Sequence, residues 1–250
     1  KEAPLASRLR PATLDEVVGQ QHIIGKDKLL YRAIKADKLG SIIFYGPPGT
    51  GKTTLAKVIA GTTSARFKQL NATVAGKKDM EEVVQEAKDA LGMYGQKTIL
   101  FVDEIHRFNK AQQDAFLPFV EKGSIVLIGA TTENPSFEVN AALLSRCRVF
   151  VLKALEETDL VKLLTNALNS PAGLKDQNVR ITQQQLKAIA AFANGDARTA
   201  LNILEMAVLN GEITADGMTV TNEGLEQCIS KKSLLYDKNG EEHYNLISAL

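Results

Sequence analysis

The sequence predicts an α/β fold, in which a parallel β-sheet with helices on both faces is followed by a small helical domain. Between about residues 40 and 152, five short β-rich runs alternate with helical segments, and this alternation is typical of parallel sheets. Three of the runs are almost continuously apolar, as expected for central strands that are covered on both faces. After residue 153 the apolar residues recur at helical spacing, and we expect no further strands.

The individual elements follow from these runs. The strands are expected at residues 41–45, 67–70, 98–102, 125–129 and 148–152. Three crossover helices are expected at residues 52–60, 79–91 and 110–121. Pro118 lies inside the third helix and should kink it or end it early. In the second part of the chain, helices are expected at residues 156–168, 182–194, 196–210 and 222–229.

The composition is that of an ordinary globular protein. Of the 250 residues, 44% are hydrophobic and 24% are charged, which argues against a disordered or collagen-like chain. No apolar run approaches the ~18 residues that a membrane-spanning helix needs. The 30 basic and 29 acidic residues give a net charge of +1, so bulk charge points to no nucleic acid or membrane. Two distant cysteines give no disulfide framework or metal site, which favours an intracellular setting.

The strongest motif is a phosphate-binding loop. Residues 46–53 read GPPGTGKT and match G-x-x-x-x-G-K-[ST], between a strand and a helix, as this loop requires. Its glycines let backbone N–H groups turn toward phosphate oxygens, and the helix N-terminus adds partial positive charge. Lys52 should reach the β- and γ-phosphates, and Thr53 should ligate Mg²⁺. The residues expected to bind the nucleotide here are Gly46, Pro47, Pro48, Gly49, Thr50, Gly51, Lys52, Thr53 and Thr54.

A pair of carboxylates ends the third strand. Residues 98–102 are mostly apolar and are followed by Asp103 and Glu104. Asp103 is expected to hold Mg²⁺, mostly through water, because Mg²⁺ gives up its waters reluctantly. Glu104 is expected to act as the general base that polarises the attacking water. Together with the phosphate loop, the pair predicts hydrolysis of Mg·ATP.

The two motifs resemble those of AAA+ ATPases, and further signatures of that family follow in the expected order. Residues 125–132 (IVLIGATT) resemble the sensor 1 strand. Motif alignment favours Thr132 over Thr131 as the polar residue that helps to position the attacking water. Asn71, after the second strand, matches the position that often restrains the catalytic Glu104 in this family.

Two arginines resemble residues that complete an AAA+ site. Residues 145–147 (SRC) resemble the arginine-finger motif of clamp-loader subunits. The resemblance implies that Arg146 stabilises γ-phosphate charge in a neighbouring subunit, with Arg148 as the rival finger. Residues 195–198 (GDAR) resemble the sensor 2 motif, which implies that Arg198 contacts the nucleotide of its own subunit.

The N-terminal segment resembles the stretch that packs around adenine in clamp-loader-type members of the family. The matching residues lie between positions 4 and 20. By this resemblance, the candidates for contact with the base are Arg10, Pro11, Val17 and Val18.

Less universal stretches narrow the family. Residues 20–25, 103–110, 129–137 and 236–250 closely resemble the RarA/MgsA family, whose eukaryotic relative is the Werner-helicase-interacting ATPase. The resemblance implies a five-stranded sheet of order 5-1-4-3-2. It also implies three parts: a nucleotide-binding core at 1–153, a helical lid at 154–232, and the start of a C-terminal oligomerisation domain at 233–250. The chain ends inside an apolar run, so we expect a piece of a longer protein.

The family resemblance implies a DNA-dependent ATPase that uses ATP and Mg²⁺ and maintains stalled replication forks in the cytoplasm, on the nucleoid. Its implied partners are DNA with forks, single-stranded ends or gaps, single-strand-binding protein, and further copies of itself. We expect a tetramer for the full-length protein, with a monomer as the alternative for this piece, and no membrane. The remaining hypotheses are a clamp-loader-like subunit, a branch-migration motor, and a nucleotide-binding scaffold without turnover.

Overall fold

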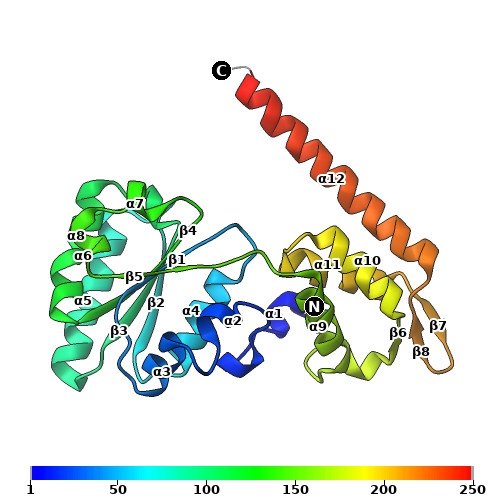
Figure 1. The fold of residues 1–250 in the computed structure, drawn as a ribbon, viewed down its shortest axis with the longest axis horizontal. Helices are drawn as coiled ribbons and strands as arrows, with labels where there is room; N and C mark the ends of the chain where they lie inside the picture. Colours follow the sequence, from blue (N-terminus) through cyan, green and yellow to red (C-terminus); the bar gives the residue numbers. More distant parts are fainter. Residues whose placement is uncertain (1, 249–250) are drawn as a thin grey trace. The chain divides into compact units, whose positions relative to one another are not determined.

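The structure is a computed structural model that describes the backbone of residues 2–248 and the side chains of residues 2–235. It divides into two compact units (Figure 1). The core unit comprises residues 11–154, and the helical unit comprises residues 2–10 together with residues 155–248.

The core unit is built on a five-stranded sheet in which every pairing is parallel. The strands are β1 (Ile42–Tyr45), β2 (Arg66–Asn71), β3 (Thr98–Asp103), β4 (Ile125–Thr131) and β5 (Arg148–Val151). Their order is β2-β3-β4-β1-β5, which confirms the expected order 5-1-4-3-2 read from the other edge. The side chains of β3 and β4 are almost completely buried, as their apolar sequences predicted.

Helices cover both faces of this sheet. On one face, Leu55 and Ile59 of α4 (Lys52–Gly61) pack in one cluster with Phe44. On the other face, α5 (Lys77–Tyr94) and α6 (Lys110–Lys122) pack against Leu100 and Leu127. The shorter helices of the core unit are η1 (Leu14–Glu16), α2 (Gln21–Ile24), α3 (Leu29–Lys35), η2 (Ile105–Arg107), α7 (Pro135–Glu138) and α8 (Ala141–Leu144).

Two crossover helices differ from expectation. Helix α5 begins at Lys77 instead of residue 79, and the carboxylate of Asp79 accepts a hydrogen bond from the backbone N–H of Gly76 (2.8 Å). Helix α6 continues through Pro118 to Lys122. Pro118 is exposed, so water can reach the carbonyl that loses its helical donor there.

The helical unit has its own hydrophobic core, formed where α9 (Glu157–Asn169), α10 (Gln183–Ala193) and α11 (Ala197–Leu209) pack together with the start of α12 (Asn222–Ser248). The side chain of Thr182 caps α10 by accepting from the backbone N–H of Gln185 (3.1 Å). The structure confirms the helices predicted at residues 156–168, 182–194 and 196–210, whereas the helix predicted at 222–229 is the start of the longer α12.

The prediction that no strands follow residue 153, and with it that the lid is all-α, is wrong. A three-stranded sheet of order β6-β8-β7 lies in the helical unit, formed by β6 (Val179–Arg180), β7 (Glu212–Thr214) and β8 (Gly217–Thr219), with η3 (Lys175–Gln177) before it. Strands of two or three residues contain no apolar run to detect, and the side chains of β7 are all exposed.

The predicted boundaries of 1–153, 154–232 and 233–250 also need correction. Residues 2–10 belong to the helical unit, because Leu5 of α1 (Leu5–Arg8) is buried in its core and the Leu5 N–H donates to the Glu205 carboxylate (2.7 Å). Helix α12 runs without a break across residues 232 and 233. The side chains beyond residue 235 lie outside the described residues, as do residues 249–250. Within the described part, no helix is long and apolar enough to cross a membrane.

Candidate nucleotide-binding site

The residues predicted to bind phosphate and Mg²⁺ and to position the attacking water follow four neighbouring strands at one edge of the sheet. Because β2, β3, β4 and β1 are adjacent and parallel, their carboxyl ends lie side by side. In the register, Asn71 is opposite Asp103, and Tyr45, which precedes the phosphate loop, is opposite Thr131. Ligands of open α/β sheets bind at this edge.

The phosphate loop connects β1 to α4 in a backbone conformation that depends on glycine. Gly49 and Gly51 have φ angles of 77° and 90°, which side chains with a Cβ adopt only with strain. A Cβ on Gly46 would lie 2.6 Å from the carbonyl oxygen of Leu152. The N–H of Gly46 also donates to the carbonyl of Thr131 (3.2 Å). The loop is therefore fixed at its start against the ends of β4 and β5.

Lys52, the first residue of α4, turns back onto this loop. Its ammonium donates to the carbonyl of Pro47 (2.6 Å) and lies 3.3 Å from the hydroxyl of Thr50. Burial lowers the pKa of Lys52, and the charge of Asp103 opposes this shift. An ammonium that is partly desolvated inside a loop of backbone N–H groups is suited to bind phosphate.

Asp103 is a partly desolvated carboxylate next to a second one. Burial raises the pKa of Asp103, and the charge of Glu104 adds to this effect. The charges of Lys52 and His106 and a backbone hydrogen bond from Glu104 act in the opposite direction. A carboxylate with unfavourable burial and a like-charged neighbour is stabilised by a divalent cation, and hard oxygen donors such as Asp103 and Thr53 suit Mg²⁺.

Glu104 has a strained backbone. Its φ and ψ are 54° and 47°, in the left-handed region, at the start of η2. Such a conformation costs a residue with a Cβ roughly 1–2 kcal/mol and is frequent at functional sites. The conformation turns the chain sharply as it leaves β3, so Glu104 begins a new element beside Asp103.

The two consecutive threonines at the end of β4 differ in their exposure to solvent. Thr132, the predicted sensor residue, is exposed. Thr131 is only 1% exposed, and its hydroxyl lies 2.9 Å from Nδ1 of His106 and accepts from the N–H of Glu133 (2.9 Å). Sequence reasoning assigned no role to His106; its position three residues after Asp103 is the sequence signal that places it near this edge of the sheet.

Asn71 lies beside Asp103, but its side chain is engaged locally. Its Oδ1 accepts hydrogen bonds from the N–H of Thr73 (3.0 Å) and from the hydroxyl of Thr73 (2.7 Å). This turn holds the side chain at the end of β2. That Asn71 restrains Glu104 stays a prediction.

Both candidate finger arginines are exposed on the core unit. Arg146 follows α8 and lies 3.4 Å from the carboxylate of Glu121. Arg148 begins β5 and is also exposed. The structure therefore leaves both side chains accessible to a neighbouring subunit, and the choice between them stays a prediction.

In the helical unit, Arg198 occupies the first turn of α11 and is exposed. Asp196 caps this helix, since its carboxylate accepts from the N–H groups of Arg198 (2.9 Å) and Thr199 (3.2 Å). Of the adenine candidates, Arg10 belongs to the helical unit, whereas Pro11, Val17 and Val18 belong to the core unit. Val17 packs against the cluster around Phe44.

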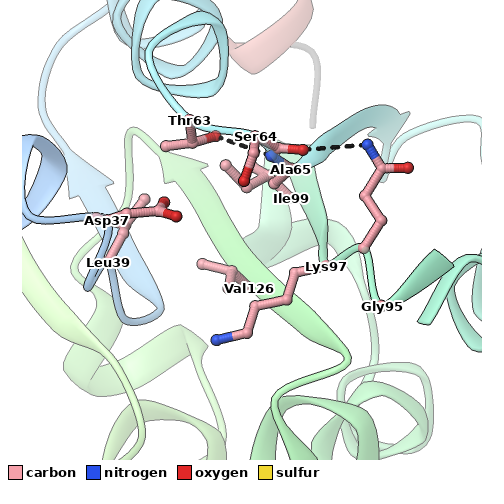
Figure 2. Close-up of a pocket in the computed structure, with 10 residues that line it drawn as sticks. Asp37, Leu39, Thr63, Ser64, Ala65, Gly95, Lys97, Ile99 and Val126 are labelled. Atoms are coloured by element: carbon pink, nitrogen blue, oxygen red, sulfur yellow. Dashed lines mark hydrogen bonds between the residues drawn. The ribbon is translucent and has the colours of Figure 1, made fainter.

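A different cavity, of about 170 Å³, lies near the amino-terminal ends of the strands (Figure 2). Ile99 of β3 and Val126 of β4 form part of its lining. Gln96 and Ser64 also line the cavity, and the side-chain amide of Gln96 donates to the carbonyl of Ser64 (3.1 Å). The cavity is smaller than the roughly 300–1,000 Å³ of typical ligand pockets, and none of the predicted nucleotide-binding residues lines it.

The phosphate loop, the acidic pair after β3 and the strand order define the core unit as an AAA+ nucleotide-binding module. Residues 42–155 match the family described as "ATPase family associated with various cellular activities (AAA)". Residues 175–250 match the family described as "AAA C-terminal domain". The structure of the RuvB Holliday junction branch migration motor from Thermotoga maritima has a TM-score of 0.71 and 26% identity, over 89% of this chain and 72% of that one.

Relatives place the chain within this class. It is 52% identical to Replication-associated recombination protein A of Coxiella burnetii and 48% identical to that of Escherichia coli K12, in each case over 99% of this chain and 56% of the relative. It is 40% identical to ATPase WRNIP1 of Dictyostelium discoideum, over 99% of this chain and 30% of the relative. The chain belongs to the family of replication-associated recombination protein A, and it spans a little over half the length of these bacterial relatives.

Proposed function

We propose that this chain binds Mg·ATP at the phosphate loop and hydrolyses it with Glu104 as general base. The observation that carries the proposal is that the loop after β1 and the pair Asp103 and Glu104 after β3 lie at the same edge of the sheet, with only β4 between the two strands. Lys52 would neutralise charge on the β- and γ-phosphates, in place of its bonds within the loop. Catalysis would then rest on positioning and electrostatics, as in other phosphoryl transfers.

Thr53 and Asp103 would hold the magnesium ion. When bound, Mg²⁺ would neutralise the negative charge that develops on the phosphates. The roles of the chain's own residues are to bind the phosphates through backbone N–H groups, to orient the attacking water through Glu104 and Thr132, and to restrain Glu104 through Asn71. Adenine would be held by Arg10, Pro11, Val17 and Val18.

Two exposed arginines would complete the reaction. Arg146 would stabilise γ-phosphate charge in the site of a neighbouring copy, and Arg198 would contact the nucleotide of its own chain. Both are exposed, which an interaction with a partner or a ligand requires. Hydrolysis would consequently depend on assembly of several copies.

The biological role that best fits the family is maintenance of stalled replication forks by a DNA-dependent ATPase in the cytoplasm. Two observations support it: the named relatives are recombination proteins, and the RuvB structure of similar fold is named a branch migration motor. DNA forks or gaps, single-strand-binding protein and further copies of the chain, as a tetramer of the full-length protein, are the proposed partners.

The test compares wild type with Glu104→Gln. The variant should bind ATP with near wild-type affinity but lose turnover, because an amide cannot accept the proton of the attacking water. Wild-type turnover in the variant would remove Glu104 as the base. The full-length protein should also hydrolyse ATP faster with forked DNA than without it, and an equal rate would exclude the fork role but leave the ATPase in place.

Subunit mixing tests the arginine finger. Arg146→Ala and Lys52→Ala should each be inactive alone in the full-length protein, because one lacks the finger and the other lacks phosphate binding. Mixed oligomers should regain part of the activity, since some sites combine an intact loop with an intact finger. Mixed oligomers without any regained activity would contradict a finger that acts between subunits, and Arg148→Ala mixed in the same way tests the rival residue.

A further inference from the structure

Gln20 is a buried polar residue that the proposed hydrolysis does not use. It is 6% exposed, and its backbone is left-handed, with φ 59° and ψ 24°. A buried amide is costly unless it is hydrogen-bonded. A glutamine with positive φ is also strained. Burial of the amide and the left-handed backbone are therefore both unfavourable at this position, and the hydrogen bonds of the side chain offset them.

The side chain of Gln20 joins the phosphate loop to the segment that follows β5. Its Nε2 donates to the carbonyl of Thr50 (3.3 Å) and to the carbonyl of Lys153 (2.7 Å). Its Oε1 accepts from the N–H of Lys153 (3.1 Å). Thr50 belongs to the phosphate loop, so one amide holds that loop and pairs with both backbone groups of Lys153.

Lys153 is almost the last residue of the core unit, and the chain enters the helical unit at Leu155. The N–H of Leu155 donates to the carbonyl of Gly195 (3.3 Å). Gly195 directly precedes Asp196, whose carboxylate caps α11 and fixes the N–H of Arg198. Hydrogen bonds and three consecutive peptide units therefore connect the phosphate loop to the turn that carries Arg198.

We propose that Gln20 is a positioning residue that transmits occupancy of the phosphate loop to the turn that carries Arg198. Binding of phosphate to the loop changes the environment of the Thr50 carbonyl, and Gln20 passes that change to Lys153. This inference rests on the proposed binding of nucleotide at the loop. It adds a route by which bound nucleotide acts on the helical unit apart from direct contact with Arg198.

The experiment measures amide hydrogen exchange at Leu155 in the full chain, without ADP and with saturating ADP and Mg²⁺. ADP binding is measured separately by calorimetric titration. In wild type, ADP should slow exchange at Leu155 by on the order of 5-fold or more, since coupling between sites is typically 5–150-fold. Wild type that binds ADP without this slowing overturns the inference and leaves the proposed function standing, whereas absence of ADP binding overturns both.

Two variants and a control isolate the side chain. Gln20→Asn keeps an amide and tolerates positive φ, but it is one methylene too short to span both partners. Gln20→Gly relieves the backbone and removes the amide. His22→Ala is the matched control, because Nε2 of His22 donates to the carbonyl of Val151 (2.9 Å) at the end of β5 without reaching the loop.

At saturating ADP, both Gln20 variants should lose most of the slowing at Leu155, while His22→Ala keeps it. A side chain that only supports the fold would lower the midpoint of unfolding but leave the effect of saturating ADP at Leu155 unchanged. Slowing that persists in either Gln20 variant overturns the inference, because the signal then arises from direct contact of ADP with the helical unit.

Discussion

Replacing Glu104 with glycine should stabilise the core unit while it removes ATP turnover. The left-handed conformation of Glu104 costs a residue with a Cβ roughly 1–2 kcal/mol. Glycine removes this cost, but it also raises the conformational entropy of the unfolded chain, which offsets roughly 0.5–1 kcal/mol of the gain. We expect a net gain of about 0.5–1 kcal/mol in the free energy of unfolding, or about 1–4 °C in the melting temperature for a unit of this size.

Two controls separate backbone strain from loss of the carboxylate. Glu104→Ala loses the carboxylate but keeps the Cβ, so it should lose turnover without the gain in stability. Asp37 also has a positive φ, of 52°, and lies away from the proposed site, beside the cavity in Figure 2. Because aspartate tolerates this conformation better than glutamate, Asp37→Gly should increase stability by less than Glu104→Gly and leave turnover unchanged.

The assay is urea unfolding of the four proteins, followed together with steady-state ATP hydrolysis. The free energy of unfolding of Glu104→Gly should exceed that of Glu104→Ala, and both should lack turnover. Equal stability of these two variants would show that the backbone at Glu104 is not strained. Turnover in Glu104→Gly would show that this carboxylate is not the general base.

Three further predictions concern the same edge of the sheet. Gly46→Ala places a Cβ 2.6 Å from the carbonyl oxygen of Leu152, just beyond β5. Urea unfolding should show that the free energy of unfolding falls by about 1–3 kcal/mol. Gly40→Ala is the control and should be neutral, because a Cβ there meets nothing within 4 Å. The pKa of Asp103 is raised in the folded protein, so its charged form opposes folding at pH values above its usual pKa of 3.8. Asp103→Asn removes that charge and should raise the free energy of unfolding of the core unit at pH 7. The gain should vanish below pH 4, where Asp103 is protonated in both the folded and the unfolded state. Thr132→Val should reduce turnover with little change in melting temperature, whereas Thr131→Val should lower the melting temperature, because it leaves partners of a buried hydroxyl unpaired.

The sequence was sufficient for the sheet and for the phosphate loop because both have strong local signals. Buried parallel strands are apolar along their whole length, and GPPGTGKT specifies its own backbone conformation through its glycines. The end of β4 illustrates the limit. Because β4 is buried on both faces, its sequence does not alternate, and no periodicity indicates which of Thr131 and Thr132 turns inward.

The features that sequence reasoning missed depend on contacts between distant residues. Leu5 is the one fully buried residue among residues 2–10, and two leucines in so short a stretch predict no packing partner. Strand β7 pairs through its backbone while its side chains stay exposed, so it has no hydrophobic pattern. The contact of Thr131 with His106 joins two elements that are separate in sequence.

Strain in the described backbone is greatest where the proposed function needs particular side chains. Among the described residues, five other than glycine have positive φ. Asn178, Asn194 and Asp37 belong to the types that tolerate this conformation, whereas Gln20 and Glu104 do not. Glu104 follows the strand that ends in Asp103, and Gln20 binds the phosphate loop. Asparagine or glycine would relieve either backbone, so we expect that the amide of Gln20 and the carboxylate of Glu104 offset this strain through the functions proposed for them.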